Sequence, residues 1–192
     1  MSEWTETATK ILDAAEEFIK TKGVNAFSFR DLQKVVGVKT SSIHYHFATK
    51  LDLIHEVAVR FLGGHKMALD HLQASEASPS ERLRKVARYF AENGRKGEFC
   101  LGGMLSSDAR TLDEKTQKIL LEFFDHFETW AASSISEGLE KGEFRSSVNP
   151  EYSSRLFVSA IEGGMLKARL MDNSDAYFEM MNELIDNLSK DV

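Results

Sequence analysis

The stretch GVKTSSIHYHFATK, residues 37–50, places a polar run directly before closely spaced apolar side chains. The run KTSS, residues 39–42, is too polar for a buried strand, and Ile43, Tyr45 and Phe47 are too apolar for a fully solvated helix. Ile43 and Phe47 are four residues apart and therefore share one face of a helix. The stretch predicts a turn at Gly37, followed by a short helix that directs these two side chains into the core.

Helices are also predicted on both sides of this stretch. Apolar residues recur at helical spacing over residues 5–22, and the basic, glycine-terminated end Lys22-Gly23 indicates a stop. Ser28, three residues before Asp31, predicts the start of a second helix that ends at Gly37, and Thr49 before Asp52 predicts the start of a fourth. The second helix is expected to bury Phe29, Leu32, Val35 and Val36.

Two short helices around a glycine turn, the second polar on its outer face, indicate a helix-turn-helix. In that arrangement the second helix of the pair is held rigidly so that its outer side can enter a major groove. The alternative is a plain helical hairpin with a solvated face. The residues expected to contact DNA are Ser28, Arg30, Lys39, Thr40, Ser41, Ser42, His44, Tyr45, His46 and Lys50.

The distribution of charge is compatible with DNA contact at one end of the chain. The net charge is −6, but residues 1–50 hold seven Lys or Arg and six Asp or Glu, and residues 24–50 hold four basic groups and one acidic group. A small basic excess is weak evidence alone, because it also fits a solvated surface.

The segment ILDAAEEFIKTKGVNAFSFRDLQKVVGVKTSSIHYHFATKLDLI, residues 11–54, resembles the DNA-binding region of TetR/AcrR-family transcriptional regulators. The resemblance includes the pattern G-V-x-x-x-x-[LI]-Y-x-H-F, with one departure: His44 stands where the family has tyrosine, which alters a common base or phosphate contact. The resemblance implies that His46 helps to fix the helix and reaches phosphate and that Phe47 lies in the core.

The histidines do not indicate a metal or catalytic site. His44 and His46 are two residues apart, so on a helix they point about 200° apart and cannot share one ion. Asp52-x-x-His55 stands alone, whereas a di-metal helical bundle needs repeated Glu-x-x-His pairs. No nucleophile elbow, phosphate-binding loop or dinucleotide fingerprint occurs. We therefore expect no metal, no cofactor and no enzyme.

The whole chain is predicted to be all-α, with about nine helices. It has 192 residues, two prolines, one cysteine and long windows rich in Ala, Leu, Glu, Lys and Met. No apolar run is long enough to span a membrane, the acidic N-terminus is not a secretory signal, and a single cysteine fits a reducing cytoplasm. After residue 50, Ser78-Pro79, Thr111 with Glu114, Asn149-Pro150 and Ser174 are expected to open further helices.

The last two helices carry more apolar and small side chains than one partner can cover, which favours a bundle formed with a second copy. The alternative is an ordinary monomeric core. The resemblance implies the same dimer, with two reading helices on successive major grooves of a palindromic operator. The residues expected at the dimer interface are Leu156, Ala160, Gly164, Lys167, Tyr177, Met181, Leu184 and Leu188.

Aromatic and methionine side chains are concentrated between residues 90 and 165, where they could form either a core or an apolar ligand cavity. Each alone is more typical of a core, and His126, Glu122 and Arg155 are candidate polar anchors. The resemblance implies a cavity whose occupancy moves the fourth helix and releases DNA. The residues expected to bind a small apolar or electrophilic effector are Phe90, Cys100, Met104, Phe123, His126, Phe127, Trp130, Phe157, Ile161 and Met165.

Cys100 follows the basic pair Arg95-Lys96 and precedes a short helix, and both features favour a reactive thiolate. The segment GEFCLGGMLSSDA, together with SIHYHF, resembles a branch of the family that responds to electrophiles through a cysteine. Glu98 opposes this effect, and a lone cysteine is most often a small apolar core residue. Sensing through Cys100 is therefore a hypothesis.

These observations predict a cytoplasmic, homodimeric regulator with a helix-turn-helix domain at residues 1–50 and a ligand-binding and dimerisation domain at residues 51–192. The expected function is a repressor that a ligand releases from a double-stranded operator. The alternatives are a repressor that senses electrophiles through Cys100 and a helical scaffold or enzyme that does not bind DNA. Residue patterns do not distinguish a repressor from an activator.

Overall fold

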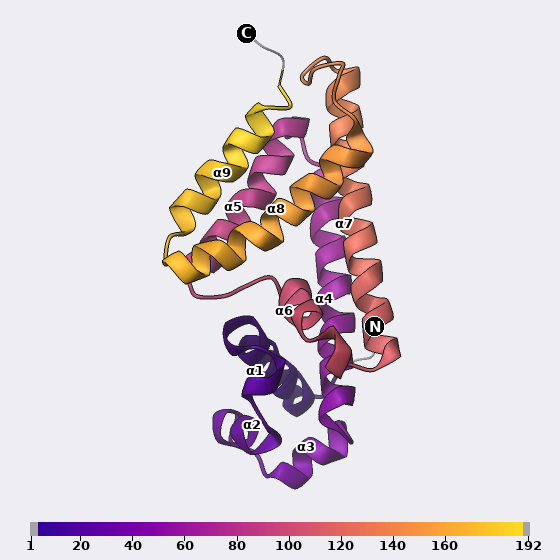
Figure 1. The fold of residues 1–192 in the computed structure, drawn as a ribbon. Coiled ribbons are helices and arrows are strands. Elements are labelled where there is room, and N and C mark those ends of the chain that lie inside the picture. The colour runs from indigo at the N-terminus through magenta and orange to yellow at the C-terminus, as the bar shows by residue number, and fades with distance from the viewer. Residues whose placement is uncertain (1–3, 190–192) are drawn as a thin grey trace. The chain divides into compact units, whose positions relative to one another are not determined.

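A computed structural model describes residues 4–189, and this part of the chain is all-α, as predicted. None of its helices is long and apolar enough to cross a membrane. The nine α-helices and two 3₁₀ turns within these residues (Figure 1) are α1 Glu6–Lys22, η1 Val24–Ala26, α2 Phe29–Val36, α3 Thr40–His46, α4 Lys50–Gln73, α5 Pro79–Arg95, α6 Leu101–Ser107, η2 Ala109–Thr111, α7 Glu114–Glu140, α8 Pro150–Met171 and α9 Ser174–Asp186.

The helices form two compact units that do not follow the order of the chain. Unit 1 contains the residues up to Gly64 together with Cys100–Glu122, and unit 2 contains His65–Phe99 and the residues from Phe123 onward. Helices α4 and α7 are each divided between the two units, α4 after Gly64 and α7 after Glu122. The predicted domains, residues 1–50 and 51–192, were defined by their roles in binding DNA and ligand. The division into units 1 and 2 rests on contacts within the chain and does not test those roles.

Unit 1 is built around the buried face of α1. Its α1 packs against α2, α3 and α6. The central side chains of these four helices, including Ile11, Leu32, Ile43 and Leu105, are fully buried. Val35 does not join them: its side chain is 61% exposed, so the prediction that α2 buries it is wrong. An eight-residue helix has room for one buried stripe, and Leu32 occupies it.

Most helix starts follow the predicted capping chemistry. The Ser28 N–H and hydroxyl donate to the Asp31 carboxylate at 3.0 and 2.7 Å, and the Ser78 N–H donates to Glu81 at 2.9 Å. For α7 the predicted cap, Thr111, is wrong, because Thr111 ends the preceding 3₁₀ turn. Asp113 takes the role by accepting the Thr116 N–H at 3.0 Å.

In unit 2, α5, α8 and α9 pack against one another (Figure 1). The small residue Gly164 allows α9 to approach α8 closely: a Cβ atom there would lie 2.8 Å from the Tyr177 ring and 2.7 Å from the Met180 methyl group. Tyr177 and Met181 are consequently buried within the chain's own core.

An ion-pair network also ties the helices of unit 2 together. The Arg82 guanidinium, only 6% exposed, donates to both Glu137 carboxylate oxygens, at 2.5 and 3.3 Å. Gln73 on α4 donates to the same carboxylate at 3.1 Å and accepts from the Ser134 hydroxyl at 3.0 Å. Glu137 therefore joins α4, α5 and α7 through one carboxylate.

Replacing Glu137 by Gln is expected to lower the free energy of unfolding by about 2 kcal/mol at pH 7, since a charge-assisted bond to a buried guanidinium is lost. Hydrogen bonds from Arg82 and then Lys141 hold the pKa of Glu137 at about 2, below its usual 4.5. A depressed folded-state pKa gives stability that is present above about pH 4.5 and is lost as the pH falls toward 2.

Urea unfolding at pH 7 and pH 3 measures this effect. The difference between the native protein and Glu137→Gln should shrink at pH 3. Glu140→Gln, an exposed change on the same helix, is the control and should alter stability at neither pH. A Glu137→Gln difference that is equal at both pH values would contradict the assignment.

Candidate nucleic-acid interface

Helix α3 is held by a buried side chain at its centre and another at its C-terminal end. Ile43 is fully buried, and Phe47, which is 2% exposed, has its ring 5.6 Å from the ring of Trp4. Gly37, with φ 76° and ψ 25°, provides the left-handed turn between α2 and α3. The two inward residues and the turn are placed as predicted, so the outer face of α3 is a polar surface on a rigid support.

Three of the predicted DNA-contacting residues lie at helix starts: Ser28 and Arg30 at the start of α2, and Thr40 at the start of α3. Ser28 is exposed but bonded to Asp31, and Arg30 is exposed in the first turn of α2. The Thr40 N–H donates to the Gln33 side chain at 3.2 Å, and its hydroxyl also donates to that oxygen. Thr40 therefore fastens α3 to α2 through Gln33, which the sequence did not indicate.

The remaining positions on α3 differ in exposure. Lys39 and Ser41 are exposed, and Ser42 is half-buried. Tyr45 is 85% exposed, and its ring meets the half-buried His46 ring edge-on at 5.1 Å. The Tyr45 phenol is thus highly accessible on this helix, and the imidazole of its neighbour supports it.

His44 is exposed, yet its ring is fixed on two sides. The ring lies edge-on to the Phe29 ring at 4.8 Å, and Nδ1 is 3.1 Å from the Ala48 carbonyl oxygen. These contacts reach back to α2 and forward to the turn before α4. The side chain at the position where the family has tyrosine is therefore held in one orientation.

Lys50 is engaged inside unit 1. Its ammonium donates to the carbonyl oxygens of Val24 and Phe27, both at 2.6 Å, and lies 4.3 Å from the centre of the Phe27 ring. Burial lowers the pKa of Lys50. Two of its three protons therefore satisfy backbone carbonyls before α2, which is a structural role. The phosphate contact expected from the sequence stays a prediction.

Another basic residue, Arg60, was not predicted to have a role, and it connects α4 to α1. The Arg60 guanidinium donates to Asp13 and Glu16, at 2.7 Å in each case. The sequence held one signal for this pairing: Asp13 and Glu16 are three residues apart and therefore share one face of α1. This pairing fixes the first half of α4 against the core of the helix-turn-helix.

The residues predicted to bind an effector divide between the two units. Seven of them form a buried cluster in unit 2 around Phe127, with the ring of Phe90 at 6.1 Å, Phe123 at 6.0 Å, Trp130 at 6.3 Å and Phe157 at 6.4 Å. Ile161 and Met165 complete the buried set, and His126 is half-buried beside it. Packing of these rings on one another is what an apolar core requires.

Two polar groups lie within this aromatic cluster. The His65 ring meets the Phe123 and Phe127 rings edge-on at 4.7 and 4.8 Å, and burial followed by repulsion from His126 lowers the pKa of His65 to about 4. The Trp130 indole N–H is buried without a hydrogen-bond partner among the described residues. A neutral imidazole and an indole donor are therefore two of the polar groups that lie against these rings.

A hollow of about 210 Å³, part of it open to solvent, lies in unit 2 and is lined in part by residues of this cluster. Because that volume includes open solvent, the enclosed part is far smaller than common ligand pockets of about 300–1,000 Å³. Of the predicted effector residues only Phe90 and Met165 contact it; the full lining is Phe90, Ala91, Gly94, Phe99, Met165, Ala168, Arg169, Ser174 and Tyr177.

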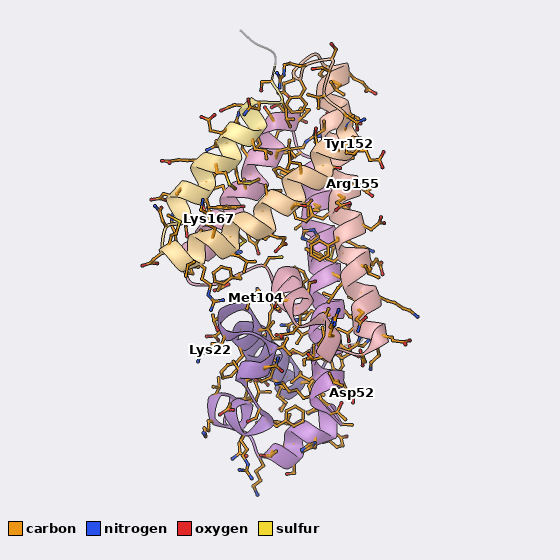
Figure 2. All side chains as sticks on the ribbon, in the orientation of Figure 1. Lys22, Asp52, Met104, Tyr152, Arg155 and Lys167 are labelled. Carbon is orange, nitrogen blue, oxygen red and sulfur yellow. The ribbon has the colours of Figure 1, made fainter. Side chains whose placement is uncertain are left out.

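Cys100 and Met104 belong to unit 1, where α6 packs on α1 (Figure 2 labels Met104). Cys100 is 4% exposed and precedes the first turn of α6. The Arg95 guanidinium, which the sequence placed as an activator of the thiol, donates to Asp175 at 2.6 Å in unit 2. Sensing through Cys100 stays a hypothesis.

The residues predicted for the dimer interface fall into two groups. Tyr177, Met181 and Leu188 are buried within the chain, and Gly164 faces α9. Their expected contact with a second copy stays a prediction. Their side chains satisfy the chain's own helix packing first. The other four are accessible: Leu156 and Lys167 are exposed, and Ala160 and Leu184 are half-buried.

A different stripe of α8 is exposed and apolar. Its members repeat at spacings of four and three residues, the pattern of a helix that packs along another helix. Leu170 is 88% exposed, and Figure 2 shows Tyr152 and Lys167 along the same helix. We call this the α8 stripe: Tyr152, Leu156, Ser159, Gly163, Leu166 and Leu170.

Both parts of the chain match known families. Residues 11–57 match the model described as bacterial regulatory proteins, tetR family, and residues 79–184 match a tetracyclin repressor-like C-terminal domain. No curated protein matches the chain.

Solved structures share the fold over almost the whole length. A TetR transcriptional regulator from Legionella pneumophila is 30% identical, with a TM-score of 0.83, covering 98% of this chain and 100% of that one. A TetR-family regulator from Agrobacterium tumefaciens is 23% identical, with a TM-score of 0.91, covering 96% and 98%. The reduced form of NemR from E. coli is 16% identical, with a TM-score of 0.85 and coverages of 97% and 98%, a likeness of fold alone.

The matched N-terminal model covers the helix-turn-helix built by α2 and α3, and the matched C-terminal model covers α5 to α8 and most of α9. The chain therefore belongs to the TetR family of bacterial regulatory proteins and is a DNA-binding transcriptional regulator.

Proposed function

We propose that the chain is a homodimeric repressor that inserts α3 into the major groove of a palindromic operator and leaves it when an effector binds. The observation that carries this proposal is the rigid support of α3, with Ile43 and Phe47 buried and Tyr45 85% exposed. Base contacts are assigned to the outer face of α3, and phosphate contacts to the basic residues beside it. The proposed DNA-contacting residues are Arg30, Lys39, Ser41, Ser42, His44, Tyr45 and His46.

The second copy is proposed to pack on the α8 stripe. Leu156, Leu166 and Leu170 expose large apolar surface at the spacing that two helices use along a shared seam. A two-fold axis across this seam makes the interface isologous, so each copy supplies the same residues. Two reading helices then face two half-sites one helical turn of DNA apart.

Release is proposed to follow from binding of a small apolar effector among the aromatic side chains of unit 2. The Trp130 indole N–H supports this, because a buried donor without a partner costs about 1–3 kcal/mol, which an acceptor on a ligand would recover. The effector must bind the form of the dimer that cannot hold DNA more tightly than the form that can. An opening of the packed rings is required, because the hollow in unit 2 is small.

Operator binding should weaken steeply as salt is added, since each phosphate contact adds about −0.9 to the slope of log affinity against log salt. Lys39→Met is expected to reduce that slope by about one and to leave unfolding unchanged, because Lys39 is exposed. Lys50→Met is expected to lower the unfolding temperature instead, because it removes two bonds to backbone carbonyls.

The measurement uses the DNA upstream of the protein's own gene in gel shift and fluorescence anisotropy between 50 and 300 mM salt, with thermal unfolding of each variant. A protein that does not bind DNA specifically would show no preference for a palindromic sequence in these binding measurements. A Lys39→Met slope equal to that of the native protein would remove Lys39 from the phosphate contacts.

A further inference from the structure

His44 is the residue of α3 whose chemistry the structure defines most narrowly. Its Nδ1 lies 3.1 Å from the Ala48 carbonyl oxygen, and its ring is braced by Phe29 at 4.8 Å. A carbonyl oxygen can only accept a hydrogen bond, so Nδ1 must carry the proton in this arrangement. The contact therefore selects one of the two forms of the neutral ring.

A neutral imidazole has a single N–H, so a proton on Nδ1 leaves Nε2 with a lone pair only. Nε2 is the other ring nitrogen, separated from Nδ1 by the Cε1 carbon, and the side chain is exposed. It can accept a hydrogen bond but cannot donate one. A phosphate oxygen, which is itself an acceptor, is consequently a poor partner for it.

In the major groove two kinds of base edge offer a donor: the N6 amino group of adenine and the N4 amino group of cytosine. Resting on the proposed function, we propose that His44 is a specificity-determining residue that accepts a hydrogen bond from one such amino group in each half-site. Ala48 and Phe29 act as its positioning partners. A tyrosine at this position could donate its hydroxyl to phosphate, whereas His44 held in this form reads a base.

The test begins by selecting duplexes from a library with randomised half-sites, at pH 8. Three proteins are compared: the native chain, His44→Asn and His44→Phe. The Asn side chain retains a donor near the place of Nδ1 and removes Nε2, while Phe retains the packing on Phe29 and removes both nitrogens. Thermal unfolding of each variant shows that the fold is kept.

One base pair per half-site should carry adenine or cytosine for the native chain and lose that preference in both variants. At this position 2-aminopurine for adenine, or 2-pyrimidinone for cytosine, removes the major-groove amino group. Either replacement should weaken native binding roughly 10-fold, the usual effect of one base contact. It should leave His44→Asn unchanged.

Two results would overturn the inference. The analogue could weaken all three proteins equally or none of them. Alternatively, His44→Phe could reduce the salt slope by about one at every sequence, which would identify a phosphate contact. If the native chain selects no common sequence at all, the proposed operator binding is refuted. If it selects a common sequence but one of the two results above is found, only the role of His44 is refuted, so the two failures are distinguishable.

Discussion

Phe47→Ala is expected to lower the free energy of unfolding by about 3–5 kcal/mol, the cost of emptying a phenylalanine site in a core. Phe47 is 2% exposed and packs on Trp4 where α3 ends. The loss is comparable to the total stability of many domains, about 5–15 kcal/mol. The variant should therefore also lose operator binding, because α3 is no longer held in one orientation.

Tyr45→Ala is the matched control two residues away. Its side chain is 85% exposed, so unfolding should change by no more than about 0.5 kcal/mol. Operator affinity should still fall, because the exposed phenol lies on the proposed reading face of α3. Urea unfolding combined with anisotropy separates the two effects, and a Tyr45→Ala protein that unfolds as easily as Phe47→Ala would refute the division of α3 into a buried and a reading face.

Leu166→Glu with Leu170→Glu is expected to convert the dimer to monomers and weaken operator binding at least roughly 100-fold. In the proposed dimer, the two-fold axis places the new carboxylates of one copy close to those of the other, which costs several kcal/mol. Each 1.4 kcal/mol is a factor of ten in affinity. Analytical ultracentrifugation at micromolar concentration measures the change in mass.

The control for this pair is Leu121→Glu on α7, a leucine that is 71% exposed and lies outside the α8 stripe. It should leave both the mass and the affinity unchanged. A dimer that survives the double substitution but dissociates with Leu121→Glu would move the interface from α8 to α7.

The helix-turn-helix could be predicted from sequence because its signals are local. Ser28 with Asp31, the glycine at position 37 and the spacing of Ile43 and Phe47 act over four residues or fewer, and each has the predicted geometry. The prediction that Thr111 caps α7 was wrong because two good capping residues stand close together there. Asp113 caps helices as well as Thr111 does and is nearer to the first turn of α7, so residue type alone could not choose between them.

The dimer face and the effector residues could not be predicted to the same degree, since they depend on contacts between distant segments. Periodicity shows that Tyr177 and Leu170 both lie on apolar faces, but only the packing of α9 on α8 decides that Tyr177 is buried and Leu170 is 88% exposed. Likewise, nothing near Lys50 in the sequence indicates that the carbonyl groups of Val24 and Phe27 bind its ammonium.

The discontinuous core of unit 1 has a consequence for the synthesis of the chain. Leu101, Leu105, Leu112 and Leu120 are buried against the helices that precede Gly64, although they are translated much later. At roughly 5–20 residues per second, several seconds separate the emergence of the two segments. The DNA-reading helices therefore leave the ribosome before the leucines that complete their core, and a nascent chain exposes that apolar surface to chaperones during the interval.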